Sequence, residues 1–193
     1  MYKPTRTPET GHNNNPKTTR EMCIIVYKPA GCRLPADYVL RHCENTNPHG
    51  FGFATPTKVF HSMNRRDFER ELKANATVEE PCLIHCRIAT HGSIKKSNCH
   101  PFVDLESGVA FAHNGMLDIK PIGDKTDSET AFLTRFVPVI REHGIESSEL
   151  DRAVDEIIGF SRFIFMNAEG HVRMFGRWYK SEFDGCYYSH LPW

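Results

Sequence analysis

One cysteine in this sequence stands where cleavage of a single peptide bond would make it an N-terminal residue. Cys23 directly follows Met22 and opens a short apolar run. An N-terminal cysteine carries its own base, because an α-amine has a pKa of about 7.7–8.0 whereas a lysine amine has about 10.4. Such a thiol can attack a carboxamide and form a thioester with loss of ammonia. Cys23 is therefore the candidate nucleophile, the alternative being a small buried hydrophobe in a strand.

Attack on a carboxamide builds negative charge on its oxygen, and Asn114 with Gly115 could stabilise that charge. The pair follows an apolar segment, residues 110–113. An asparagine amide and the backbone N–H of the next glycine, at the end of a strand, supply two donors to an oxyanion. The alternative is a plain Asn-Gly turn, which is common between strands. Beside a candidate nucleophile we favour the oxyanion role.

Arg87 and Asp127 are candidates for holding a free amino acid by its charged groups. A guanidinium can bind a carboxylate in a bidentate manner, and a carboxylate can pair with an ammonium group. The alternatives are a strand-end cation for Arg87 and a helix N-cap for Asp127, which could serve both purposes. A nucleophile, an oxyanion site and two charge clamps are together what is needed to attack the side-chain amide of an amino acid.

A zinc site is the competing interpretation, because several potential ligands cluster in sequence. These are His85, Cys86, His91, Cys99, His100 and His113. None of the tight Cys-x-x-Cys or His-x-x-x-His pairings of structural zinc sites occurs among them. His85 and Cys86 are adjacent in a predicted strand, so their side chains should point to opposite faces. We therefore predict no metal and no other cofactor.

Composition narrows the class of protein. The 193 residues suit one domain with a real core, and the formal net charge of zero argues against a nucleic-acid partner. No apolar run approaches the roughly 20 residues that span a bilayer, so we expect no membrane association. The seven cysteines include no Cys-x-x-Cys pair, and the N-terminus lacks the pattern of a secretory signal. We therefore expect free thiols and a cytoplasmic location.

The first 22 residues differ from the rest of the chain. They hold three prolines and an Asn-Asn-Asn run but no Ile, Leu, Val or Phe. Such a segment buries too little apolar surface to offset the entropy of ordering it. We predict that residues 1–22 are a disordered extension or propeptide and that residues 23–193 form one catalytic domain.

The elements that must position these residues alternate between strand-like and helix-like patterns. Helices are predicted from apolar spacing and caps, and strands from short apolar runs. The predicted strands are 23–27, 50–54, 58–61, 82–88, 108–113, 163–166, 171–175 and 187–190, and the predicted helices are 36–43, 65–74, 128–143 and 148–158. This order is typical of an α+β fold with helices packed on antiparallel sheets.

The motifs taken together resemble one family. In order they are Met22-Cys23, residues 47–52 (NPHGFG), 85–92 (HCRIATHG), 98–102 (NCHPF), 112–115 (AHNG) and 127–129 (DSE). Each is weak alone, but their joint order and spacing is specific. From Cys23 to about Pro138 the chain resembles the glutaminase domain of the class II glutamine amidotransferases, which are N-terminal nucleophile hydrolases.

The resemblance implies a four-layer αββα sandwich and a set of residue roles. It implies hydrolysis of L-glutamine to glutamate and ammonia through Cys23, with Asn114 and Gly115 at the oxyanion. It places Arg87 on the substrate's α-carboxylate and Asp127 on its α-amine. Thr90, His91 and His100 would line the same pocket. For its α-amine to be free, either translation starts at Met22 and this initiator methionine is removed, or a processing cut before Cys23 is required.

The identity of the ammonia acceptor stays open at this point. Members of the family usually carry a synthase domain, and no segment after Pro138 is long enough to be one. We expect a separate synthase subunit as partner, or else a stand-alone amidase. Two other functions remain possible: an amidase acting on another γ-glutamyl-type amide, and a catalytically silent protein that binds an amino acid or a partner.

Overall fold

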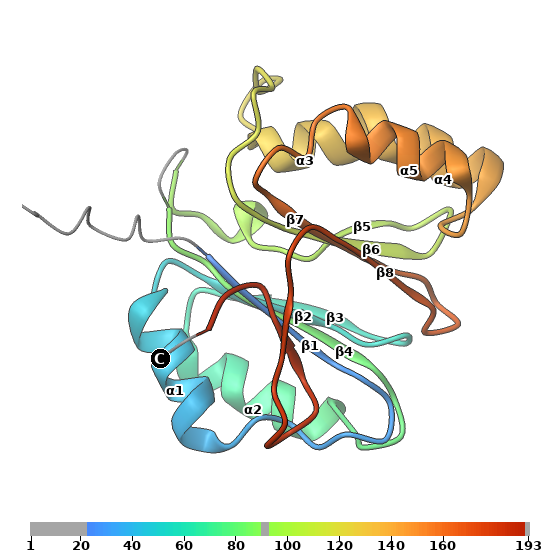
Figure 1. The fold of residues 1–193 in the computed structure, drawn as a ribbon. Helices are drawn as coiled ribbons and strands as arrows, with labels where there is room; N and C mark the ends of the chain where they lie inside the picture. Colours follow the sequence, from blue (N-terminus) through green and yellow to red (C-terminus); the bar gives the residue numbers. More distant parts are fainter. Residues whose placement is uncertain (1–22, 90–92, 192–193) are drawn as a thin grey trace, which may run out of the picture.

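The computed structural model describes residues 23–89 and 93–191, and its elements form four layers (Figure 1). Helices α1 and α2 cover one face of a first sheet, a second sheet packs on the other face, and α3 to α5 cover the second sheet. All strand pairs are antiparallel. The predicted α+β class with two antiparallel sheets flanked by helices is confirmed.

In the described residues the first sheet has six strands and contains both the first and the last strand of the chain. Its central strand pair places Ile24 opposite Cys86, so the segment that follows Cys86 runs past Cys23. In spatial order the strands are β3 (Val59–Ser62), β2 (Phe51–Ala54), β4 (Cys82–Cys86), β1 (Ile24–Lys28), β10 (Tyr187–Tyr188) and β9 (Tyr179–Lys180).

The second sheet has four strands in the same part of the chain, with β6 and β7 at its centre. Every residue of β6 is buried, because one face packs on the helices and the other on the first sheet. In spatial order the strands are β5 (Phe102–Asp104), β6 (Val109–Asn114), β7 (Arg162–Met166) and β8 (Val172–Phe175).

Helices α1 (Asp37–Thr46) and α2 (Arg65–Asn75) bury apolar residues at helical spacing against the first sheet. In α2 these residues are Phe68 and Leu72. The Asn64 side chain accepts the Asp67 N–H at 3.2 Å, which satisfies one of the free donors at the start of the helix.

The predicted helix 128–143 is interrupted. It consists of α3 (Asp127–Ala131), a π-helical turn η2 (Phe132–Phe136) and α4 (Val137–His143). Pro138 lies at the start of α4 and has no N–H to donate, so the regular ladder cannot run through this point. Helix α5 (Ser148–Asp155) then packs beside α4, with the Ser147 hydroxyl accepting the Leu150 N–H.

The layers are held by three apolar cores. Phe111, Phe132, Phe136 and Phe163 dominate the core between the second sheet and its helices. The core between the two sheets is made of smaller side chains, which are Ile25, Ala54, Leu83, Ala110, Ala112, Ile164 and Met166. Within the described residues no helix is long and apolar enough to cross a membrane.

Candidate active site

Cys23 lies immediately before β1, at the wall of a pocket of about 520 Å³. Its Sγ donates to the carbonyl oxygen of Ile88 at 3.3 Å and accepts from the Ile88 N–H at 3.4 Å. These contacts arise because β1 and β4 are paired, so the residues beyond the end of β4 pass alongside the start of β1. The candidate nucleophile is therefore fixed against the segment that carries Arg87.

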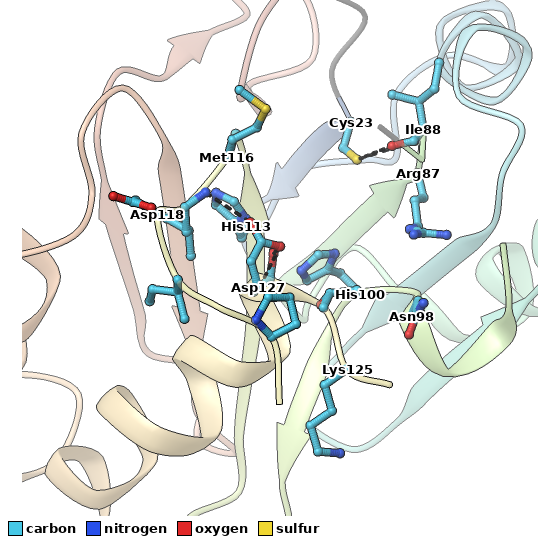
Figure 2. A pocket seen from close by; sticks show the side chains of 16 residues that line it. Cys23, Arg87, Ile88, Asn98, His100, His113, Met116, Asp118, Lys125 and Asp127 are labelled. Atoms are coloured by element: carbon cyan, nitrogen blue, oxygen red, sulfur yellow. Dashed lines mark hydrogen bonds between the residues drawn. The ribbon is translucent and has the colours of Figure 1, made fainter. Parts of the chain in front are cut away.

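The pocket brings together most of the residues that the sequence singled out (Figure 2). Its lining includes Cys23, Arg87, His100, Gly115 and Asp127, which come from five separate parts of the chain. Cys23 precedes β1 and Arg87 follows β4, both strands of the first sheet, and Gly115 follows β6 of the second, so the pocket lies where the two sheets meet. Thr90 and His91 lie outside the described residues.

The thiol of Cys23 is in an environment that disfavours its charged form. Burial is the main cause and raises its pKa above the ordinary value, with a smaller contribution in the same direction from Asp127. The Ile88 N–H and the positive charge of Arg87 act in the opposite direction. Little thiolate is therefore present at neutral pH, and a nucleophilic Cys23 needs a base.

Arg87 follows β4 directly and is only 4% exposed although it lines the pocket. Its Nη1 donates to the carbonyl oxygen of Ser93 at 3.2 Å. The Asn98 side chain donates to the same oxygen at 2.9 Å, so the loop 93–98 supports the guanidinium from one side. A buried guanidinium in a pocket wall is a strong binding group for a carboxylate.

Asp127 is the first residue of α3, and its carboxylate is held in a fixed orientation. One oxygen accepts the Leu117 N–H at 3.0 Å and the other accepts the Ser128 N–H at 2.8 Å. The helix is capped by Thr126, whose hydroxyl accepts the Glu129 N–H, and not by Asp127. Asp127 is consequently available to present a negative charge to the pocket.

Gly115 adopts φ +143°, a conformation that residues with a side chain rarely adopt. A Cβ at this position would lie 2.3 Å from the Ser161 hydroxyl, so only glycine fits. Asn114 is fully buried and does not itself line the pocket. Its Nδ2 donates to the Ser189 hydroxyl at 2.8 Å and lies 3.4 Å from Nδ1 of His190.

Three buried histidines line or adjoin the pocket, and of these only His100 was predicted from the sequence to line it. The rings of His85 and His100 lie 4.5 Å apart between the sheets, and those of His100 and His113 lie 6.4 Å apart. Burial lowers the pKa of His85 to about 3, that of His113 to about 4 and that of His100 well below its usual range. All three are therefore neutral at physiological pH.

His113 and Ser128 were missed as pocket residues by the sequence reasoning. Nδ1 of His113 lies 2.7 Å from the Ser128 hydroxyl, and Nε2 of His113 has no partner among the described residues. Both side chains line the pocket beside Asp127. The alternation of the strand 109–114 could have indicated the orientation of His113, because residues two apart in a strand, here Phe111 and His113, face the same side of the sheet.

The pocket holds charges of both signs and no metal-binding cluster. Across residues 23–89 and 93–191, no group of three or more His, Cys, Asp or Glu side chains could hold a metal ion. His85 and Cys86 do point to opposite faces: His85 stacks on His100 between the sheets and Cys86 joins the core under α1 and α2. The arrangement suits recognition of a small zwitterion next to a thiol.

Comparison with known proteins identifies the family of the chain. No curated protein matches the chain. The model of the family described as "Glutamine amidotransferases class-II" matches residues 65–173, a segment that contains Arg87, His100, Gly115 and Asp127. The matched segment begins after Cys23 and ends before Ser189. Because it covers more than half of the 193 residues, the chain belongs to the class II glutamine amidotransferases.

Proposed function

We propose that this protein hydrolyses L-glutamine to glutamate and ammonia through a thioester on Cys23, and that the ammonia passes to a separate synthase subunit. The observation that carries the proposal is that Cys23, Arg87 and Asp127 line one pocket although 64 and 40 residues separate them in turn (87 − 23 and 127 − 87). A thiol, a cation and an anion at the wall of one small cavity match the three reacting or charged groups of glutamine.

Recognition of the substrate follows from the charges. The buried guanidinium of Arg87 binds the α-carboxylate, and the oriented carboxylate of Asp127 binds the α-ammonium group. With both charged groups of the α-carbon held, the side-chain carboxamide at the other end of the molecule extends toward Cys23. His100 forms part of the neutral wall of the same pocket. Thr90 and His91 remain predictions for this pocket.

The chemistry begins with removal of the proton from the thiol. Since burial raises the pKa of Cys23, a base is needed, and the α-amine of Cys23 supplies it once the Met22–Cys23 bond has been cleaved. The sulfur then bonds to the amide carbon, and the negative charge on oxygen is stabilised by the Gly115 N–H and the Asn114 amide. When the tetrahedral intermediate collapses, the C–N bond breaks and the nitrogen takes the proton held by the α-amine, so that it leaves as ammonia. Water then hydrolyses the thioester to glutamate.

The test compares two forms of the protein, one starting at Met1 and one starting at Cys23, each treated with a diazoketone analogue of glutamine. Intact mass and peptide mapping give the site of modification, and released ammonia gives turnover. We expect one adduct on Cys23 and turnover only in the form that starts at Cys23. Cys23→Ala abolishes both, whereas Cys32→Ala, which removes the other partly exposed thiol, leaves both unchanged.

Two results would contradict the proposal. One is an adduct that forms equally well in Cys23→Ala. The other is a form that starts at Cys23, binds glutamine and releases no ammonia, which would support a silent binding protein instead. Release of ammonia from other γ-glutamyl amides in preference to glutamine would redirect the proposal to a related amidase.

A further inference from the structure

The side chain of Asn114 meets the last strand of the first sheet. Ser189, which follows β10, donates its N–H to the carbonyl oxygen of Ile25 and accepts the Ile25 N–H on its hydroxyl oxygen, both at 3.0 Å. Ile25 lies two residues after Cys23. The same hydroxyl is 2.8 Å from Nδ2 of Asn114. Ser189 therefore joins the strand of the candidate nucleophile to the candidate oxyanion residue.

The amide of Asn114 can take two orientations, which differ in how many buried polar groups they leave without a hydrogen bond. With Nδ2 directed at Ser189, the serine oxygen accepts two hydrogen bonds and its own hydrogen has no acceptor among the described residues. Oδ1 of Asn114 is buried and also lacks a partner in that part of the chain. Two buried polar groups are thus unsatisfied, which native structures usually avoid.

A rotation of 180° about the terminal side-chain bond exchanges the two ends of the amide. Oδ1 then accepts the Ser189 O–H, which satisfies both of those groups. Nδ1 of His190 lies 3.4 Å from the position that Oδ1 then occupies, and in its Nδ1–H form it donates a second hydrogen bond to Oδ1. The NH₂ group takes the position that Oδ1 leaves, which is buried and which no hydrogen-bond donor of the described residues reaches.

We propose that Ser189 is a positioning residue that holds Asn114 in this turned orientation, so that the amide NH₂ points away from Ser189 and can donate to the oxyanion of the substrate. The inference rests on the proposed function and deepens it. Gly115, the next residue, lines the pocket and supplies the other donor, so the two donors are adjacent in the chain. Ser189 lies beyond the segment that the family model matches.

The role of Ser189 predicts an effect on turnover and not on substrate affinity. Ser189 does not line the pocket, so KM for glutamine should change less than about threefold. Loss of a single oxyanion donor typically lowers kcat by about 10²–10³-fold, and a misdirected donor should cost about tenfold to a hundredfold. Ser189→Ala should show this loss, and Ser189→Thr, which keeps the hydroxyl, should recover most of it.

The kinetic experiment uses Ser189→Ala, Ser189→Thr and a matched control, Ser181→Ala. Ser181 directly follows β9, the strand that pairs with β10, and its hydroxyl accepts the Phe183 N–H at 3.3 Å. All three are compared as chains that start at Cys23, with thermal unfolding measured in parallel. We expect Ser181→Ala to keep the wild-type kcat. Unchanged kcat in Ser189→Ala, or equal losses in Ser181→Ala and Ser189→Ala, would overturn the inference.

Binding of two ligands distinguishes a positioning role of Ser189 from a general distortion of the pocket in Ser189→Ala. With the γ-aldehyde analogue of glutamine, the Cys23 thiol gives its proton to the α-amine, the sulfur bonds to the aldehyde carbon, and the C=O π bond opens to place the negative charge on oxygen in a tetrahedral adduct. L-Glutamate binds the same pocket without this adduct. Ser189→Ala should weaken binding of the aldehyde about tenfold or more and leave glutamate binding within about twofold. Equal weakening of both ligands would contradict a positioning role.

A spectroscopic readout distinguishes failure of the inference from failure of the proposed function. In ¹⁵N-labelled wild-type protein, the Asn114 side-chain NH₂ should show no cross-relaxation with the Ser189 β-hydrogens if the amide is turned. Strong cross-relaxation would overturn the inference even if glutamine is hydrolysed. Absence of ammonia release by the wild type with the amide turned would instead overturn the proposed function alone.

Discussion

At the scale of single residues, the two charged side chains near Cys23 have opposite effects on the pKa of its thiol. Arg87 lowers the pKa of the thiol and Asp127 raises it, while burial raises it more than either. A site that must hold a zwitterion needs both charges, so the thiol cannot be activated by Arg87 alone. This is the physical reason for assigning deprotonation to the freed α-amine.

The two charges should shift the reactivity of Cys23 in opposite directions. In the chain that starts at Met1, where Cys23 has no α-amine, Asp127→Asn removes a negative charge, lowers the thiol pKa and moves the pH profile of alkylation to lower pH. Arg87→Gln moves it to higher pH. Iodoacetamide labelling of the Cys23 peptide measures both. Shifts of the same sign in the two variants would show that neither charge acts directly on the thiol.

Asp127 should also decide whether a substrate needs an α-amine. In the chain that starts at Cys23, the wild type should prefer glutamine over glutaramate, the analogue without this amine, by about tenfold to a hundredfold in kcat/KM. Asp127→Asn should remove most of that preference. Glu129→Gln is the matched control, because Glu129 lies on the same turn but pairs with Lys125. The assignment of Asp127 fails if the preference survives in Asp127→Asn.

Single residues were predicted from the sequence only where a motif carried them. Cys23, Arg87, His100, Gly115 and Asp127 all line the pocket. His113 and Ser128 stand inside two of the motifs but were given no role in the pocket, and Ser189 was not named at all, because their contacts join segments 15 and 75 residues apart. A short motif records neighbours along the chain, whereas these contacts depend on the pairing of strands.

At the scale of elements, the aromatic core under α4 and α5 holds the second sheet in place. Phe136 is fully buried and its ring lies 5.2–5.5 Å from those of Phe111, Phe163 and Phe165. Phe136→Ala should lower the free energy of unfolding by about 3–5 kcal/mol. Phe160→Ala, at a phenylalanine that is 99% exposed, should change it by less than about 0.5 kcal/mol. Urea unfolding measures the free energy of unfolding of both variants. Similar decreases in the two variants would contradict a tightly packed core around Phe136.

Elements were predicted well where they are long and poorly where they are short. Helices α1, α2 and α5 were predicted within a few residues of their observed bounds, and so were the strands of the pairs β2–β3 and β7–β8. Strands β5 and β9 were missed, since three and two residues give no recognisable alternation. The π-helical turn before Pro138 was also missed, because apolar spacing alone does not report a local change of helical register.

At the scale of the whole molecule, the buried histidines join the two sheets and make stability depend on pH. His85 lies on β4 in the first sheet and His113 on β6 in the second. Both are neutral when folded and take up protons on unfolding below a pH of about 6.5. Stability should therefore fall as the pH decreases from about 6.5 toward 4.

The expected loss from His113 alone is on the order of 3 kcal/mol at pH 4, because its folded-state pKa is about 4. Urea unfolding at pH 7, 5.5 and 4 measures the trend. His85→Phe, which keeps the aromatic contact with His100, should make the curve shallower. His42→Phe, at an exposed histidine of α1, should leave the curve unchanged. A wild-type stability that is constant between pH 6.5 and 4 would contradict neutral burial of these rings.

The position of β10 beside β1 has a consequence for the timing of activity during synthesis. β10 is the last strand in chain order, yet it pairs with the first, and Ser189 just beyond it contacts both Ile25 and Asn114. A chain still emerging from the ribosome can present its thiol long before this strand exists. It cannot complete the first sheet until β10 has docked. Under the proposed function, nascent chains would therefore carry an incomplete oxyanion site, and glutamine would be spared until β10 had docked.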